Sequence, residues 1–386
     1  MMSLVANWNY PTNVRLGRGR VKELPEILRE FGIARPLVVT DSGLAPMPIT
    51  QAMIEVLAAA NVPYSVFSEV RSNPVASGID AGVAAFRAGA HDGVVAFGGG
   101  SALDSGKVIA FMARQRLPVW DFEDIGDRWK RADAAAIAPV VAIPTTAGTG
   151  SEVGRAGVIT DEKTHTKKVI FHPGMMPKVA LLDALVTAGM PPKVTAGTGM
   201  DALAHCLEAY CSPAYHPMAE GIAVEGMRLC FAYLPRVFAD GGDLEARAQM
   251  LSAAAMGATA FQKGLGAIHS LSHPVGALYD THHGMTNAVF MPYVLVANRP
   301  AIEGKIRRLA AYLELGTSFE SFLEAVLKLR AKVEVPETLA EFGIPGDQRE
   351  KIAAMALVDP TAGGNPLALT RERALEIFDS AMAGRL

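Results

Sequence analysis

The sequence of 386 residues contains few cysteines, and their arrangement excludes several kinds of site. Cys206, Cys211 and Cys230 are its three cysteines, and no two of them form a CxxC pair. An odd number without paired spacing fits neither a disulfide framework nor a thiolate zinc site, and it is typical of the reducing cytoplasm. We therefore expect a cytoplasmic protein whose chemistry depends on other side chains.

An excess of charge of one sign and long apolar runs are also lacking. Lys and Arg number 36 against 39 Asp and Glu, which gives a net charge of −3, and no basic stripe marks a nucleic-acid surface. The apolar stretches, such as 134–143, are too short to span a bilayer. The N-terminal MMSLVANWNY lacks the basic and apolar regions of a signal peptide. The expectation is a soluble protein without nucleic-acid or membrane partners.

Half of the residues are hydrophobic, and a chain of this length is expected to form two domains. The first part alternates short apolar runs with helical patterns, which predicts βαβ units and a mostly parallel sheet. The runs lie at 36–40, 62–67, 94–97 and 138–143, with helical patterns at 50–60 and 79–88.

After about residue 183 the pattern becomes helical. Turn signals, among them Pro191-Pro192 and Pro300, separate the predicted helices at 200–210, 219–233, 244–261, 302–313, 319–329 and 371–383. We therefore expect a Rossmann-like α/β domain over residues 1–186 and an all-helical domain over residues 187–386.

A glycine-rich turn follows the apolar run 94–97. Gly98-Gly99-Gly100-Ser101 leads into a predicted helix, whose free N–H groups and dipole favour a phosphate group. The alternative is a tight turn in which Ser101 and Asp104 form a capping box. The stretch matches neither the GxGxxG fingerprint nor a Walker loop.

Two more polar positions follow apolar strands. The loop 144–152 is rich in Thr and Gly, and Asp41 ends the run 36–40. Open α/β sheets bind ligands at such strand ends, where a carboxylate can accept a ribose hydroxyl. Each feature alone is also compatible with an ordinary turn.

Most of the nine histidines lie between residues 205 and 283. Asp201 and His205 have i,i+4 spacing, as do His269 and His273, and His283 follows. This spacing places each pair on one helical face. A single pair is more often a surface hydrogen bond, and a lone histidine more often a core residue. Together they predict a nitrogen and oxygen site for Fe(II), Zn(II) or Mn(II).

These segments together resemble the iron-containing (group III) alcohol dehydrogenases from end to end. The matching segments are Gly98–Ser101 with Asp104 and Lys107, Pro144–Glu152, Gly199–His205, and His269, His273-Pro274 and His283-Gly284. The resemblance implies a dehydroquinate-synthase-like fold, with a dinucleotide-binding domain, a helical metal-binding domain and an active site between them. It implies an NAD-linked enzyme that interconverts an alcohol with an aldehyde or ketone, using Fe(II), with Zn(II) as the alternative.

The resemblance also implies roles for individual residues. It assigns the metal to Asp201, His205, His269 and His283, and places His273 beside the nicotinamide as a proton relay. A carboxylate at Asp41 favours NAD over NADP. Members are commonly dimers or larger oligomers, and Asn9–Arg18 resembles the strand that helps to form the dimer. The implied cofactor positions are Asp41, Asn73, Gly99, Gly100, Ser101, Asp104, Thr145, Thr146, Thr149, Val158 and Lys167.

Departures from the family pattern bear on the substrate. Lys263 stands where many relatives have an apolar or amide side chain, and Leu367 where many have arginine. A Lys263 ammonium in the pocket would favour an anionic substrate such as a semialdehyde; otherwise it is a solvated side chain.

Other functions stay open. The chain is also compatible with a hydroxyacid–oxoacid transhydrogenase or semialdehyde reductase of the same family. A glycerol-dehydrogenase-like polyol enzyme usually has three protein ligands to its metal, and the fourth candidate ligand here argues against it. A cofactor-binding protein without turnover would be expected to have a broken ligand set, whereas this set is complete.

Overall fold

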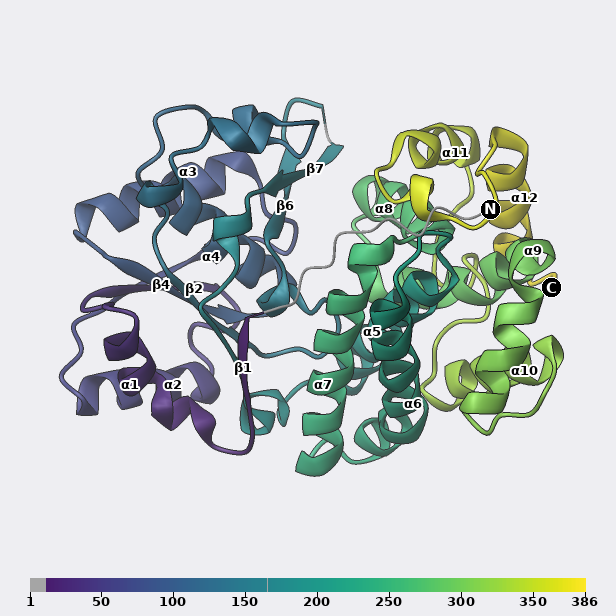
Figure 1. Cartoon of the computed structure of the whole chain (residues 1–386), viewed down its shortest axis with the longest axis horizontal. Coiled ribbons are helices and arrows are strands. Elements are labelled where there is room, and N and C mark those ends of the chain that lie inside the picture. The colour runs from purple at the N-terminus through teal and green to yellow at the C-terminus, as the bar shows by residue number, and fades with distance from the viewer. Residues whose placement is uncertain (1–11, 165) are drawn as a thin grey trace. The chain divides into compact units, whose positions relative to one another are not determined.

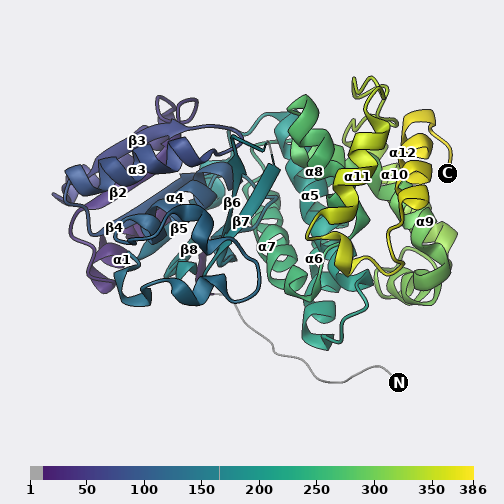
Figure 2. The same cartoon turned by 90° about the horizontal axis from the view of Figure 1, so that it is seen from above.

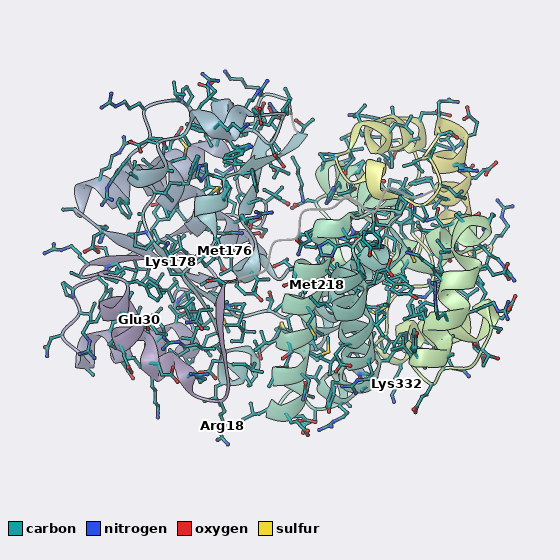
Figure 3. All side chains as sticks on the ribbon, viewed as in Figure 1. Arg18, Glu30, Met176, Lys178, Met218 and Lys332 are labelled. Atoms are coloured by element: carbon teal, nitrogen blue, oxygen red, sulfur yellow. The ribbon has the colours of Figure 1, made fainter. Side chains whose placement is uncertain are left out.

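The computed structural model describes residues 12–164 and 166–386, which divide into two compact units. One unit ends at Gly189 and the other runs from Met190 to Leu386, close to the boundary expected at 186–187 (Figure 1). Charged side chains such as Glu30 and Lys332 are exposed at the surfaces of their units (Figure 3). Among the described residues, no helix has the length and apolar character needed to cross a membrane.

The first unit is built on a six-stranded parallel sheet of order β1-β8-β5-β4-β2-β3. A separate antiparallel hairpin of β6 and β7 was not predicted from the sequence. The strands are β1 (Asn13–Leu16), β2 (Pro36–Asp41), β3 (Ser65–Val70), β4 (Gly93–Gly98), β5 (Val140–Pro144), β6 (Ala156–Asp161), β7 (Thr166–Phe171) and β8 (Val179–Leu182).

Helices cover both faces of this sheet (Figures 1 and 2). They are α1 (Leu24–Glu30), α2 (Pro48–Ala59), α3 (Ala76–Ala88) and α4 (Gly100–Met112). Val38 and Val95 pack on the side of α1 and α2, whereas Leu37 and Val94 pack on the side of α3 and α4. Because both faces are buried, β2 and β4 are apolar at successive positions, which made these strands recognisable in the sequence.

The edge strand β1 exposes Val14 and Leu16, each 41% accessible. It belongs to the segment Asn9–Arg18, for which the family resemblance implies a dimer contact. Residues 9–11 lie outside the described part of the chain, and the homodimer stays a prediction.

The second unit is helical, as predicted, with α5 at its centre and α6, α7 and α9 packed around it (Figure 1). All residues of α5 from Thr195 to Cys211 are buried, and small residues let its neighbours approach. A Cβ on Gly199 would lie 2.3 Å from Leu234 Cδ1. The helices are α5 (Pro192–Cys211), α6 (Pro217–Ala239), α7 (Leu244–Ala260), α8 (Ala267–Tyr279), α9 (His283–Tyr312), α10 (Phe319–Lys332), α11 (Arg349–Val358) and α12 (Arg371–Ala383).

Pro300 does not separate two helices, so that prediction was wrong. Helix α9 continues through Pro300 to Tyr312. A proline inside a helix costs about 3 kcal/mol through its missing N–H and its steric clash. Ile302 and Ile306 on the same helix are buried, and burial of each large apolar side chain contributes about 1.5–3 kcal/mol. Tertiary packing therefore outweighs the local preference.

Candidate functional site

The two polar loops predicted separately form one surface at the carboxyl ends of β4 and β5. Thr145 N donates to Gly98 O at 2.9 Å. A Cβ on Gly100 would lie 2.6 Å from Thr149 Cγ2, so a larger residue there would push the loops apart. Neighbouring strands thus present backbone groups side by side, as nucleotide-binding α/β sheets do.

Helix α4 begins at Gly100 without a side-chain cap, so the capping-box alternative was wrong. Ser101 Oγ instead donates to Ser72 O at 2.5 Å. The first-turn N–H groups of a helix have no partner within the helix, and together with its dipole they form a site for a phosphate anion.

Asp104 and Lys107 hold the second loop against α4. Asp104 accepts hydrogen bonds from Ser151 Oγ at 2.5 Å and Val158 N at 3.0 Å. The buried Lys107 donates to Ser151 O at 2.9 Å, and burial lowers the pKa of this lysine despite the carboxylate of Asp104 at 3.3 Å. Both side chains therefore hold the loop in place through contacts from α4.

Asp41 forms a local turn and also lies close to the glycine turn. Its Oδ1 accepts from Gly43 N and Leu44 N, both at 2.9 Å, which forms a local turn. Its Oδ2 lies 3.8 Å from the position of a Cβ on Gly98, so the carboxylate also borders the glycine turn.

The other implied cofactor positions in this unit are Gly99 against Thr146, the half-buried Asn73, Val158 on β6, and Lys167 on β7.

The second unit brings the four predicted metal ligands together. Asp201 and His205 lie on α5, His269 on α8, and His283 at the start of α9. Asp201 Oδ1 lies 3.8 Å from Nε2 of His205 and of His269 and 3.6 Å from Nε2 of His283. Donors bound at ~2.0–2.2 Å to one ion lie ~3–4 Å apart. The donor atoms of Asp201, His205 and His269 all lie within 4.8 Å of one another and could hold one divalent ion, and His283 Nε2 lies beside this group, 3.6 Å from Asp201 Oδ1.

The amide of Asn287 on α9 faces three of the four predicted ligands. Its Nδ2 lies 2.8 Å from Asp201 Oδ1 and 3.1 Å from Nε2 of both His269 and His283. An amide NH₂ has two hydrogens, so it can donate a full hydrogen bond to at most two of these three atoms at once, although all three face the same region. Asn287 was not foreseen from the sequence, although its i,i+4 spacing from His283 was a usable signal.

Glycine at position 284 is required for this convergence. A Cβ there would lie 2.2 Å from Gly197 O and 2.9 Å from Asp201 Cβ. The start of α9 can therefore reach α5, and bring His283 to Asp201, only without a side chain at this position.

His273 lies beside the cluster and has a carboxylate partner of its own. Its Nδ1 is 2.8 Å from Asp359 Oδ2, and its ring stacks on His283 with centroids 5.3 Å apart. A carboxylate only accepts, so Nδ1 donates and Nε2 is left able to take a proton. Burial opposes ionisation of Asp359, yet hydrogen bonds from His273 and Thr361 keep the pKa of this carboxyl below its usual value. Asp359 is remote in sequence and was not foreseen.

Comparison with known proteins identifies the family to which both units belong. The model of the iron-containing alcohol dehydrogenases matches residues 11–184, and that of the family's C-terminal domain matches residues 195–382. The chain belongs to the iron-containing alcohol dehydrogenase family. It is therefore an oxidoreductase of the type that interconverts an alcohol with an aldehyde or ketone.

Three relatives of this family member cover nearly all of it. The 4-hydroxybutyrate dehydrogenase of Cupriavidus necator is 38% identical over 368 residues, which are 92% of this chain and 94% of the relative. The structure of a 1,3-propanediol oxidoreductase has a TM-score of 0.91 and 31% identity, covering 98% of this chain and 100% of that one. A sulfoacetaldehyde reductase from Bifidobacterium kashiwanohense in complex with NAD+ has a TM-score of 0.89 and 27% identity, covering 98% of each chain.

Lys263 of this family member is neither in a substrate pocket nor solvated, which were the two alternatives considered from the sequence. Its side chain is fully buried, and Nζ donates to three carbonyl oxygens at the end of α5, those of Ala209, Tyr210 and Ser212, at 3.0, 3.0 and 2.6 Å. Nζ also lies 2.9 Å from Glu220 Oε1. Burial lowers the pKa of Lys263 to about 8. The ammonium thus caps the C-terminus of α5, which leaves no donor for a substrate.

We expect Lys263→Met to lower the free energy of unfolding by about 1–3 kcal/mol, because it leaves buried carbonyl oxygens at the end of α5 without this donor. Urea and thermal unfolding measure the loss. The matched control is Lys328→Met, whose side chain is 74% exposed and whose surface pair contributes about 0–1 kcal/mol. Equal, small losses in both variants would contradict the capping role.

Proposed function

We propose that this chain catalyses the NAD-dependent interconversion of an alcohol and an aldehyde, with one divalent ion held by Asp201, His205, His269 and His283. The observation that carries the proposal is the convergence of Asp201 Oδ1 with the three Nε2 atoms. Fe(II) is the metal proposed from the family, and Zn(II) is the alternative because it binds such sites more tightly.

The chemistry proposed for each group follows from its surroundings. A bound divalent ion supplies a Lewis acid that lowers the pKa of a substrate hydroxyl. His273 accepts the released proton at Nε2, because the bond from Nδ1 to Asp359 holds the ring in one orientation. The glycine turn and the N-terminus of α4 would hold the pyrophosphate of a nicotinamide dinucleotide, which would supply the hydride acceptor.

The metal assignment predicts different outcomes for neighbouring histidines. His269→Ala and His283→Ala should lose the bound ion and the activity together, as measured by metal analysis and NADH formation. His273→Ala should keep the ion and slow turnover by roughly 10²–10⁴-fold as a lost proton relay. Full activity in metal-free protein, or metal loss in His273→Ala, would be incompatible with these roles.

The cofactor assignment predicts a preference for NAD over NADP. The carboxylate of Asp41 beside the glycine turn should accept a ribose hydrogen bond and repel a 2′-phosphate. We expect Asp41→Gly to shift the ratio of kcat/KM toward NADP. Glu55→Gln, an exposed change on α2, is the charge-matched control. An unchanged ratio in Asp41→Gly would refute this role for Asp41.

We further propose that the substrate carries an anionic group at the end remote from the carbonyl. Two of the compared relatives, 4-hydroxybutyrate dehydrogenase and sulfoacetaldehyde reductase, are named for such substrates. We expect kcat/KM for succinic semialdehyde to exceed that for butanal by tenfold or more, since charged hydrogen bonds contribute about 1.5–3 kcal/mol. Lys263→Met should leave this ratio unchanged. Equal kcat/KM values for both aldehydes in the wild type would contradict the proposal.

A further inference from the structure

Glu208 is a buried carboxylate close to the proposed metal ligands. It follows Asp201 and His205 along α5 at i+7 and i+3, on the same helical face, and is 6% exposed. Burying an ionised carboxylate is costly unless hydrogen bonds compensate it. Its two oxygens meet two different groups of α8, the backbone N–H of Ile268 and the ring of His269.

The contact with His269 determines which ring nitrogen carries the proton. Glu208 Oε2 lies 2.6 Å from His269 Nδ1, and both groups are buried. An ionised carboxylate has no proton to donate, so Nδ1–H must be the donor. In a neutral imidazole the lone pair then belongs to Nε2, the nitrogen 3.8 Å from Asp201 Oδ1. Such a partner also makes the ring a more basic ligand.

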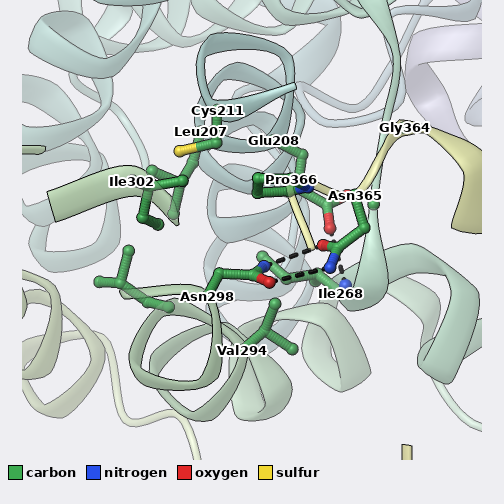
Figure 4. Close-up of a pocket in the computed structure, with 12 residues that line it drawn as sticks. Leu207, Glu208, Cys211, Ile268, Val294, Asn298, Ile302, Gly364, Asn365 and Pro366 are labelled. Carbon is green, nitrogen blue, oxygen red and sulfur yellow. Dashed lines mark hydrogen bonds between the residues drawn. The ribbon is translucent and has the colours of Figure 1, made fainter. Parts of the chain in front are cut away.

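The contact with Ile268 anchors the beginning of α8. Glu208 Oε1 accepts from Ile268 N at 2.7 Å, and Asn365 Oδ1 accepts from Ala267 N at 3.1 Å. Figure 4 shows Glu208, Asn365 and Ile268 lining the same pocket. A negative charge at a helix N-terminus is favoured by the helix dipole. One carboxylate therefore sets both the start of α8 and the orientation of the histidine in its first turn.

We propose that Glu208 is a positioning residue of the metal centre, which holds His269 as the Nδ1–H tautomer so that Nε2 is free to bind the ion. This inference rests on the metal site of the proposed function. Asn365 provides the matched control, because it caps the same helix end while its other hydrogen bonds go to Asn298 and Leu367.

Glu208→Gln separates the two roles because it changes charge and donor pattern at nearly constant shape. A glutamine has one carbonyl oxygen for two N–H groups. If it accepts from Ile268 N, its NH₂ faces Nδ1 and moves the histidine proton to Nε2. We expect the affinity for Zn(II), measured by competition with a chelating dye, to fall 10–100-fold. Asn365→Ala should lower the thermal midpoint of the metal-free protein and change the affinity less than threefold.

A spectroscopic measurement tests the inference without a metal or a variant of Glu208. In metal-free wild type labelled with ¹⁵N-histidine, the His269 resonances, assigned through His269→Gln, should show Nδ1 protonated and Nε2 bare at pH 8. An Nε2–H tautomer would overturn the inference, and so would affinity losses of equal size in Glu208→Gln and Asn365→Ala. If the wild type binds no divalent ion, the proposed function is wrong. The ¹⁵N resonances of His269 still show which ring nitrogen carries the proton, so the two failures can be distinguished.

Discussion

The burial of α5 is the constraint on which the helical unit depends. This helix passes through the centre of the unit, yet it carries Asp201, His205 and Glu208 among its buried residues. A polar group removed from water costs several kcal/mol when it lacks a partner. Several of the segments packed against α5 therefore contribute a specific polar group as well as apolar surface. Asn287 of α9 meets Asp201, α8 meets Glu208, and Lys263 meets the last carbonyls.

The polar contacts are possible only because backbones come unusually close. Gly284 lets α9 touch α5 beside Asp201, and a Cβ on Gly257 would lie 3.0 Å from the Cβ of His205. Close packing also limits the rotamers of the ligand side chains, because interiors of this density leave no room for alternatives. These small residues of α7 and α9 thus help to position the functional groups of α5.

Much of this was visible in the sequence, for identifiable physical reasons. The continuous apolar runs of β2 and β4 reflect burial on both faces, and the i,i+4 spacing of Asp201 and His205 reflects one helical face. Partners remote in sequence gave no such signal. Asp359 is 86 residues from His273, and Glu208 is 61 from His269. The position of Lys263 was predicted wrongly because its partners are carbonyl oxygens, which every residue has. Pro300 was predicted to separate two helices, but packing overrode this local preference.

The exposure of the proposed ligands differs between the two sides of the cluster. The side chains of Asp201, His205 and His269 are 3%, 6% and 2% exposed, whereas that of His283 is 31% exposed. His273 is 25% exposed and stacks on His283. Catalytic metal sites keep one position open, while closed sites serve structure. The more exposed side of the cluster, at His283, is also the side of His273, the residue proposed to accept the proton. A substrate arriving there would meet the proposed ion and the proposed base together, whereas Glu208 and Lys263 are buried inside the helical unit.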